Sequence, residues 1–217
     1  MFLQRLTKSI AICATVIAAA SSAAISGQGM PRNGGSNARF APAAGGAVGA
    51  VDSVSTSTFV ILTVAGQKVT VNEDSSTEYS KGANSIPASA IIKGDNVLVL
   101  GTVNGPTITA SQVVVRPADP GGPATSPAAG VVPFERGAPS AAKQVGQVPA
   151  NYTQGSGTIV SGTEANKATE VALADYPGGI VDRVVELSNG EYEVHNIGVN
   201  WPHHIFVSHD FKVVGAF

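Results

Sequence analysis

The sequence has one cysteine, Cys13, among its 217 residues. It lies inside the apolar run "IAICATVIAAA" near the N-terminus, and Ile12 precedes it where a bacterial lipoprotein has a small residue. We therefore expect no lipid on this cysteine. Without that run the chain has no thiol, which excludes disulfides, thiolate metal sites and a cysteine nucleophile.

Charged residues are also scarce, at 13% of the chain, and the formal net charge is −2. Such a balance does not attract nucleic acid or anionic lipid. The sequence lacks His-Glu-x-x-His, Gly-x-Ser-x-Gly, a phosphate-binding loop and the Rossmann glycine pattern. Ser188, Ser208 and Asp210 lie near histidines, but small polar residues in hairpin turns need no catalytic explanation. We expect no enzyme, no cofactor and no nucleic-acid partner.

The N-terminus has the pattern of a secretory signal peptide over residues 1–24. Arg5 and Lys8 precede the apolar run, and the small residues of "SSAAISGQG" follow it. Cleavage is expected after Ala20 or Ala24, and the alternative is an uncleaved N-terminal anchor. Removing this segment changes the formal net charge from −2 to −4. The protein is therefore expected to be secreted or in the cell envelope, with no membrane span after cleavage.

Residues 25–46 have no apolar period and are typical of a flexible tether. Between residues 47 and 116 the pattern changes to short runs rich in Val, Ile and Thr, separated by turn-forming residues. The runs cover residues 47–55, 58–66, 67–73, 95–103 and 107–115. Five strands at this spacing predict a small antiparallel barrel or sandwich.

Residues 46–116 resemble a family of small OB-like barrels found in secreted bacterial proteins. The matching features are a Gly-x-Val start, "VTV" followed by Thr77, "KGDNVLVLG" and a closing "ITASQV". The resemblance implies a five-stranded antiparallel OB-like barrel and a secreted setting, but no chemistry. Single-strand nucleic-acid binding on such a barrel needs a basic groove with aromatic platforms. In residues 46–116 the acidic residues are at least as numerous as the basic ones, which leaves no basic groove. Phe59 and Tyr79 are the only aromatic residues of this segment.

Residues 117–160 are dominated by Pro and Ala, with apolar side chains too sparse for a core. This segment is expected to be an inter-domain linker. The pattern changes again in residues 161–217. Ala165, Ala168, Val171, Ala172 and Tyr176 recur at helical spacing, and a Pro-Gly-Gly sequence ends the pattern.

Four short apolar runs follow this predicted helix, over residues 180–187, 191–199, 203–208 and 211–217. An Asn-Gly pair between the first two is a strong hairpin signal. The segment is therefore predicted to be an α+β unit with one helix packed on a four-stranded antiparallel meander. The whole chain is expected to be mainly β with an α+β part.

Residues 163–217 resemble the PepSY family and its PepSY-like relatives. The matching words are "ALADYPGG" with a following "VDRV", then "GEYEVH" and the terminal "DFKVVG". Members of that family occur in propeptides of secreted metalloproteases and as free envelope modules. The resemblance implies a module that restrains or assists a secreted peptidase, and it implies no catalytic residues.

The four histidines are the best chemical clue in the chain. Because neighbouring residues of a strand face opposite ways, His203 and His204 cannot share a ligand, and His209 lies too far along the strand. Folding back at Asn200-Trp201 places Ile197 opposite His204 and His195 opposite Phe206. In that register His195 and His204 are diagonal neighbours, about 7–8 Å apart at Cα.

This register puts Tyr192, Val194, Ile205 and Val207 on the face that suits the helix. The opposite face carries Glu193, His195, His204 and Phe206. We expect that face to be open and its polar residues to be solvated. The alternative is a weak divalent-metal site formed by Glu193, His195 and His204, although a slip of one residue would exchange His204 for His203.

Two aromatic residues of this region are candidates for contact with a partner, Trp201 and Phe206. Trp201 is either such a contact or, preferentially, a plug of the core, since tryptophan is usually highly buried. The leading hypothesis is a non-enzymatic secreted or envelope protein that binds a protein or peptide. From residue 163 onward eight acidic residues face three basic ones, which would suit a cationic surface. A metal-binding envelope protein is the alternative.

Overall fold

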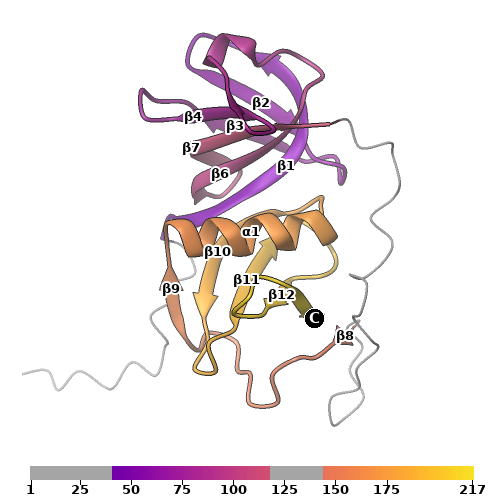
Figure 1. Ribbon diagram of the computed structural model, residues 1–217. Helices are drawn as coiled ribbons and strands as arrows, with labels where there is room; N and C mark the ends of the chain where they lie inside the picture. Colours follow the sequence, from indigo (N-terminus) through magenta and orange to yellow (C-terminus); the bar gives the residue numbers. More distant parts are fainter. Residues whose placement is uncertain (1–40, 118–143) are drawn as a thin grey trace, which may run out of the picture. The chain divides into compact units, whose positions relative to one another are not determined.

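The computed structural model describes residues 41–117 and 144–217 (Figure 1). This part of the chain is mainly β, with a single α-helix, which agrees with the predicted class. The predicted signal peptide, most of the predicted tether and residues 118–143 of the predicted linker lie outside the described residues. Among the described residues, no helix has the length and apolar character needed to cross a membrane.

The first described segment forms seven strands and one 3-10 helix. They are β1 (Ala43–Val54), β2 (Thr58–Leu62), β3 (Lys68–Asn72), β4 (Glu78–Lys81), β5 (Asn84–Ser85), η1 (Ala88–Ala90), β6 (Asn96–Asn104) and β7 (Thr107–Arg116). Alternation of apolar residues explains them, because the inward side chains of β2 and β3 are Phe59, Ile61, Val69 and Val71, all buried. These side chains form one core with those of β6 and β7.

The strand pairs close into a ring in the order β1–β2–β3–β7–β6–β1. It is not the five-stranded antiparallel barrel that the sequence predicted. β3 and β4 both pair with β7 in the parallel direction, one after the other along the same edge. The short β4–β5 hairpin, which the sequence analysis missed, supplies two further strands. β4 pairs with the part of β7 that β3 is too short to reach.

The second described segment forms six strands and the helix. They are β8 (Val145–Gly146), β9 (Thr158–Val160), α1 (Thr163–Asp175), β10 (Ile180–Glu186), β11 (Tyr192–Ile197), β12 (His204–Val207) and β13 (Val213–Ala216). β10 to β13 pair consecutively and antiparallel, in the order of the predicted meander. The helix packs its small side chains, among them Ala165, Ala168 and Ala172, against the face that carries Val194 and Ile205.

β1 connects the two segments through hydrogen bonds. One edge of β1 pairs with β6, while the other pairs with β10 at Gly46 and Ala47 before it reaches β2. A Cβ on Gly45 would collide with the carbonyl oxygen of Val181, so glycine is what permits the close approach. The two predicted domains therefore touch, and β1 begins at Ala43, inside the predicted tether.

The predicted linker needs a correction over its described part, residues 144–160. β8 pairs with β13 and β9 pairs with β10, so this part extends the sheet at two places. Val148 and Tyr152 are buried and pack against Val185 and Phe206 on the sheet face opposite α1. The segment is low in apolar residues, but these two side chains are enough to cover a short four-stranded face.

Candidate functional site

The strands β11 and β12 bring the predicted site residues together, in a register two residues away from the predicted one. His195 lies opposite His204, and Glu193 lies opposite Phe206. Because side chains alternate with a period of two, a slip of two residues leaves each side chain on its face. Glu193, His195, His204 and Phe206 therefore share one face, as the sequence predicted.

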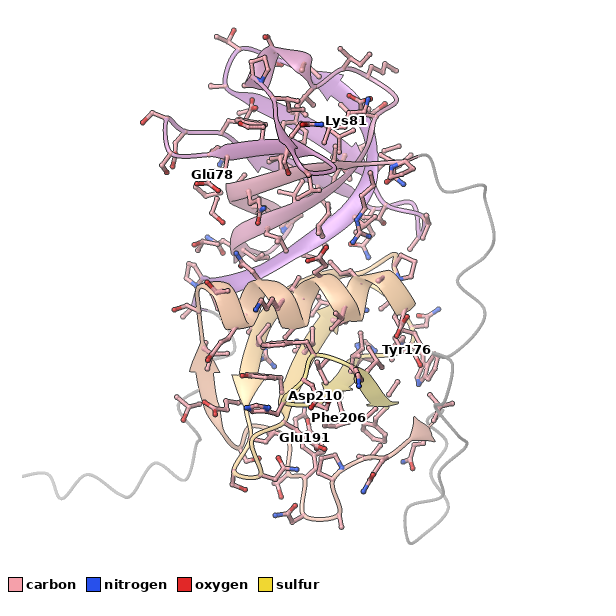
Figure 2. All side chains as sticks on the ribbon, in the orientation of Figure 1. Glu78, Lys81, Tyr176, Glu191, Phe206 and Asp210 are labelled. Carbon is pink, nitrogen blue, oxygen red and sulfur yellow. The ribbon has the colours of Figure 1, made fainter. Side chains whose placement is uncertain are left out.

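That face is not open. Glu193 is 1% exposed, His204 is 5% exposed, and Phe206, labelled in Figure 2, is completely buried. The expectation of solvated residues is wrong for these side chains because Tyr152 packs against all three of them and Phe217 packs against His204. Val148 adds to the same small core around Phe206. The prediction that Phe206 contacts a partner is wrong for the same reason.

The buried residues form a hydrogen-bonded group. The imidazole Nδ1 of His204 lies 2.7 Å from Oε1 of Glu193, and the hydroxyl of Tyr152 donates to the same oxygen at 2.8 Å. The other carboxylate oxygen of Glu193 is buried and has no hydrogen-bond partner among the described residues. Burial without compensation is costly for a carboxylate, so Tyr152 and His204 hold Glu193 in place.

His195 has a different partner. Its Nδ1 lies 2.6 Å from Oδ1 of Asp182, and Nη1 of Arg183 donates to Oδ2 of the same carboxylate at 3.1 Å. The rings of His195 and His204 are 5.2 Å apart between centroids. Adjacent residues of a regular strand face opposite ways, but the register of β10 shifts between Val181 and Arg183, which lets Asp182 reach both groups.

The metal alternative rested on Glu193, His195 and His204. These side chains lie together, yet their hydrogen bonds join Glu193 to His204 and Tyr152, and His195 to Asp182. Within residues 41–117 and 144–217 no group of three or more His, Cys, Asp or Glu side chains is placed to hold a metal ion. No metal-dependent step is therefore derived for this cluster.

Trp201 is half-buried beside the core under α1. Its ring meets that of Tyr176 edge to face, with 5.5 Å between centroids. Trp201 therefore packs at the edge of this core.

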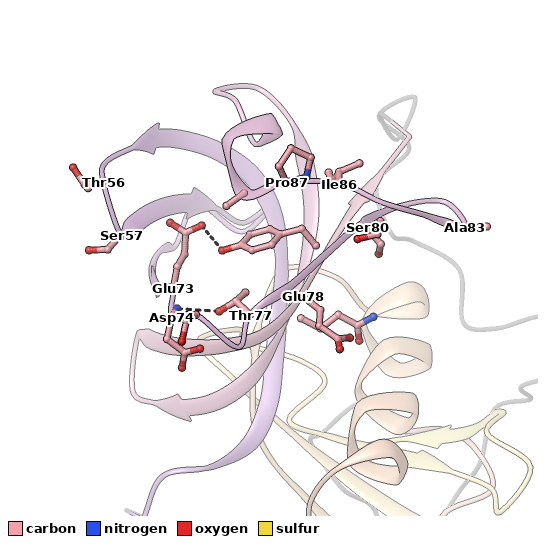
Figure 3. Close-up of a pocket in the computed structure, with 15 residues that line it drawn as sticks. Thr56, Ser57, Glu73, Asp74, Thr77, Glu78, Ser80, Ala83, Ile86 and Pro87 are labelled. Atoms are coloured by element: carbon pink, nitrogen blue, oxygen red, sulfur yellow. Dashed lines mark hydrogen bonds between the residues drawn. The ribbon is translucent and has the colours of Figure 1, made fainter.

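A second candidate site lies on the ring of strands. It is a cleft of about 990 Å³ between the β1–β2 turn, the segment that joins β3 to β4, and the segment from β5 to η1 (Figure 3). Its lining combines three carboxylates, Glu73, Asp74 and Glu78, with several hydroxyls. Ile86 and Pro87 supply an apolar part of the wall.

Hydrogen bonds fix the acidic wall of the cleft. The hydroxyl of Tyr79 donates to Oε1 of Glu73 at 2.6 Å, and the hydroxyl and amide of Ser76 donate to Oδ1 of Asp74. The bonds from Ser76 lower the pKa of Asp74, so this carboxyl is ionised at neutral pH. Burial, followed by the neighbouring Glu73 carboxylate, raises the pKa of the Tyr79 phenol, which therefore stays a donor. Thr77 ties the segment to β7 by donating to the carbonyl oxygen of Ala110.

The three carboxylates of the cleft have no basic partner among the described residues. Lys68 and Lys93 pair with Asp52, and Arg116 pairs with Glu170, while Lys81 at the end of β4 makes no ion pair among the described residues. None of the lining residues described is basic. The cleft therefore presents uncompensated negative charge beside an apolar wall.

Sequence reasoning missed three residues of the buried cluster: Tyr152, Asp182 and Arg183. The signal for the last two was a polar pair inside the otherwise apolar run "IVDRVVEL". The signal for Tyr152 was an aromatic residue in a Pro- and Ala-rich segment. Glu73, Asp74 and Glu78 were seen only as charges that oppose nucleic acid, because the cleft depends on the position of β5 and η1.

Comparisons with known proteins do not assign either site. No protein-family model, no curated protein and no solved structure matches this chain.

Proposed function

We propose that this chain is a non-enzymatic, exported protein that binds a cationic segment of a partner protein or peptide in the acidic cleft. The observation that carries the proposal is a large cleft with three carboxylates that lack basic partners among the described residues. Large concave sites with a few convergent polar groups are the usual places of ligand binding. Opposite charges supply specificity and raise the association rate.

Strand geometry adds a second support. β5 is the last strand of the pairing order, and Asn84 and Ser85 are exposed. A peptide in extended conformation adds to such an edge by main-chain hydrogen bonds, and side-chain pockets beside it give specificity. Ser85, Ile86 and Pro87 line the cleft next to this edge, so an added peptide would place Lys or Arg side chains near Glu73 and Glu78.

The family resemblances belong to the same proposal. The ring order with one parallel pair between β3 and β7 supports a relation to OB-like domains by strand order. A helix on the consecutive pairs β10 to β13 supports a relation to PepSY-like modules. On the PepSY-like relation, the partner would be a secreted peptidase. The signal-like pattern of residues 1–24 supports export.

The first prediction tests the cleft with a charge reversal. Glu78 is exposed on the wall of the cleft, and Glu78→Lys places a positive charge there. A peptide of about ten residues rich in Lys and Arg should bind the variant about tenfold more weakly, which corresponds to about 1.4 kcal/mol. Fluorescence anisotropy of a labelled peptide measures the dissociation constant.

Asp210→Lys is the matched control, since it changes the net charge equally on an exposed residue outside the cleft. Its dissociation constant should stay within about twofold of the original, because salt screens distant exposed charges over about 10 Å. Equal weakening by the two variants would leave only a general charge effect and would contradict the proposal. So would equally tight binding of a peptide rich in Asp and Glu.

A further inference from the structure

Arg183 is a buried cation whose hydrogen bonds within the described residues are incomplete. The residue is 7% exposed, and its Nη1 donates to Asp182. Its Nε is buried and has no hydrogen-bond partner among the described residues. A guanidinium has five N–H donors, and an unsatisfied buried donor is destabilising. Because Nε is shut off from solvent, a ligand reaches only the donors on Nη1 and Nη2, which make no hydrogen bond other than that with Asp182 among the described residues.

His195 presents a second unused group beside Arg183, its pairing partner on the neighbouring strand. A carboxylate accepts but does not donate, so the short contact with Asp182 places a hydrogen on Nδ1 of His195. The ring is thereby oriented, and its Nε2 has no hydrogen-bond partner in the part of the chain that the structure describes. Asp182 thus positions the guanidinium and the imidazole at once.

Arg183 and His195 face a cavity of about 500 Å³. Asp182 and Ile197 line it on the side of the C-terminal sheet. Val103, Asn104 and Gly105 line it from the β6–β7 turn. The cavity thus has a polar end with the guanidinium and the imidazole, and an apolar part with Val103 and Ile197.

We propose that this cavity binds the carboxylate of a small amphiphilic molecule. The carboxylate lies against Arg183 and His195, and the apolar body packs against Val103 and Ile197. Asp182 already balances the charge of Arg183, and Nε2 of His195 donates to a carboxylate only in the imidazolium form, so the guanidinium is the main anchor for a monoanion. A phosphate dianion carries more negative charge than this site compensates beside Asp182, so the chemistry favours a carboxylate.

Two sources present this chemistry: the C-terminus of a peptide and a free short-chain carboxylic acid. The proposal concerns a site different from the acidic cleft, and it does not depend on binding there. Three probes separate the sources: isovalerate, an acetylated tripeptide that ends in valine with a free carboxylate, and the same tripeptide as its C-terminal amide. Amide chemical shifts of the full chain report binding residue by residue.

At least one of the two carboxylates should shift the amides of Asn104, Gly105, His195 and Ile197 saturably, in the millimolar range expected of so small a ligand. The amidated tripeptide should cause no saturable shift. Saturable shifts with isovalerate would identify a free acid as the ligand. Saturable shifts with the tripeptide carboxylate alone would identify the C-terminus of a peptide. Absence of saturation with both carboxylates, or equal binding of the amide, would overturn the proposal.

Asn104→Asp tests the site without disturbing buried groups, since Asn104 is exposed at the end of β6. A negative charge on the cavity wall should weaken carboxylate binding about tenfold while the melting temperature stays unchanged. Arg183→Gln should abolish binding where it folds, and Arg116→Gln, outside the cavity, should not affect it. Unchanged affinity in Asn104→Asp would contradict the assigned position of the carboxylate.

Discussion

At the scale of single residues, the contact between Glu193 and His204 is the one whose loss should cost the most stability. Both are buried, and Tyr152 adds a hydroxyl to the same carboxylate oxygen. Loss of one hydrogen-bond partner from such a buried group is severe, because the group left behind stays desolvated without compensation.

Replacement of His204 by leucine tests this contact. The free energy of unfolding should fall by about 3 kcal/mol, because the buried carboxyl of Glu193 loses its closest hydrogen-bond partner. The same replacement at the exposed His209 is the control, with an expected change within about 0.5 kcal/mol. Urea unfolding of both variants gives the comparison, and equal small effects would show that Glu193 does not depend on His204.

The sequence predicted correctly that these residues share one face of the sheet, but it predicted that this face is open to solvent. Strand alternation alone puts Glu193, His195 and His204 on the same side of the sheet. Whether that side meets solvent depends on residues 144–152, from which Val148 and Tyr152 join the core on this face. No periodic pattern links a two-residue strand such as β8 to a face that lies far along the chain.

Among the elements, α1 was predictable because its small residues recur at helical spacing and Pro177 follows its end. β4, β5, β8 and β9 were not, since these short strands hold at most two large apolar side chains each and show no periodic pattern. α1 also carries an unfavourable charge at its C-terminal end. Burial raises the pKa of Asp175 there, and the helix dipole opposes a negative charge at this end.

Asp175→Asn should therefore stabilise the protein at neutral pH. A folded-state pKa above the unfolded value means that the ionised carboxylate costs folding free energy at pH values above both. The substitution should raise the free energy of unfolding by about 0.5 kcal/mol at pH 7. The gain should disappear below pH of about 3.9, where the carboxyl is protonated in both states.

Urea unfolding at pH 7 and at the lowest pH at which the protein stays folded measures this difference. Asp210→Asn, in the exposed turn before β13, is the control and should bring no gain because it removes the ion pair with Lys212. A loss of stability in Asp175→Asn at pH 7 would contradict the account of the helix end.

At the scale of the whole molecule, the described residues belong to one compact unit rather than two separate ones. Residues 45–47 of β1 pair with β6 on one side and with β10 on the other. The buried hydroxyl of Thr63 donates to the carbonyl oxygen of Gly178, which adds a second connection. The sequence predicted strands in both halves, but pairing between residues so far apart leaves no local pattern. The only sequence feature related to this pairing is the pair Gly45 and Gly46, where a Cβ would collide with the neighbouring backbone.

The central claim is that the acidic cleft is the binding surface, and amide chemical-shift mapping on the full chain tests it most directly. A peptide rich in Lys and Arg is titrated into isotope-labelled protein. The account predicts saturable shifts at Glu73, Asp74, Glu78 and Ser85, which lose most of their amplitude in Glu78→Lys and keep it in Asp210→Lys. Shifts confined to the acidic residues of the C-terminal half, with none around the cleft, would contradict it.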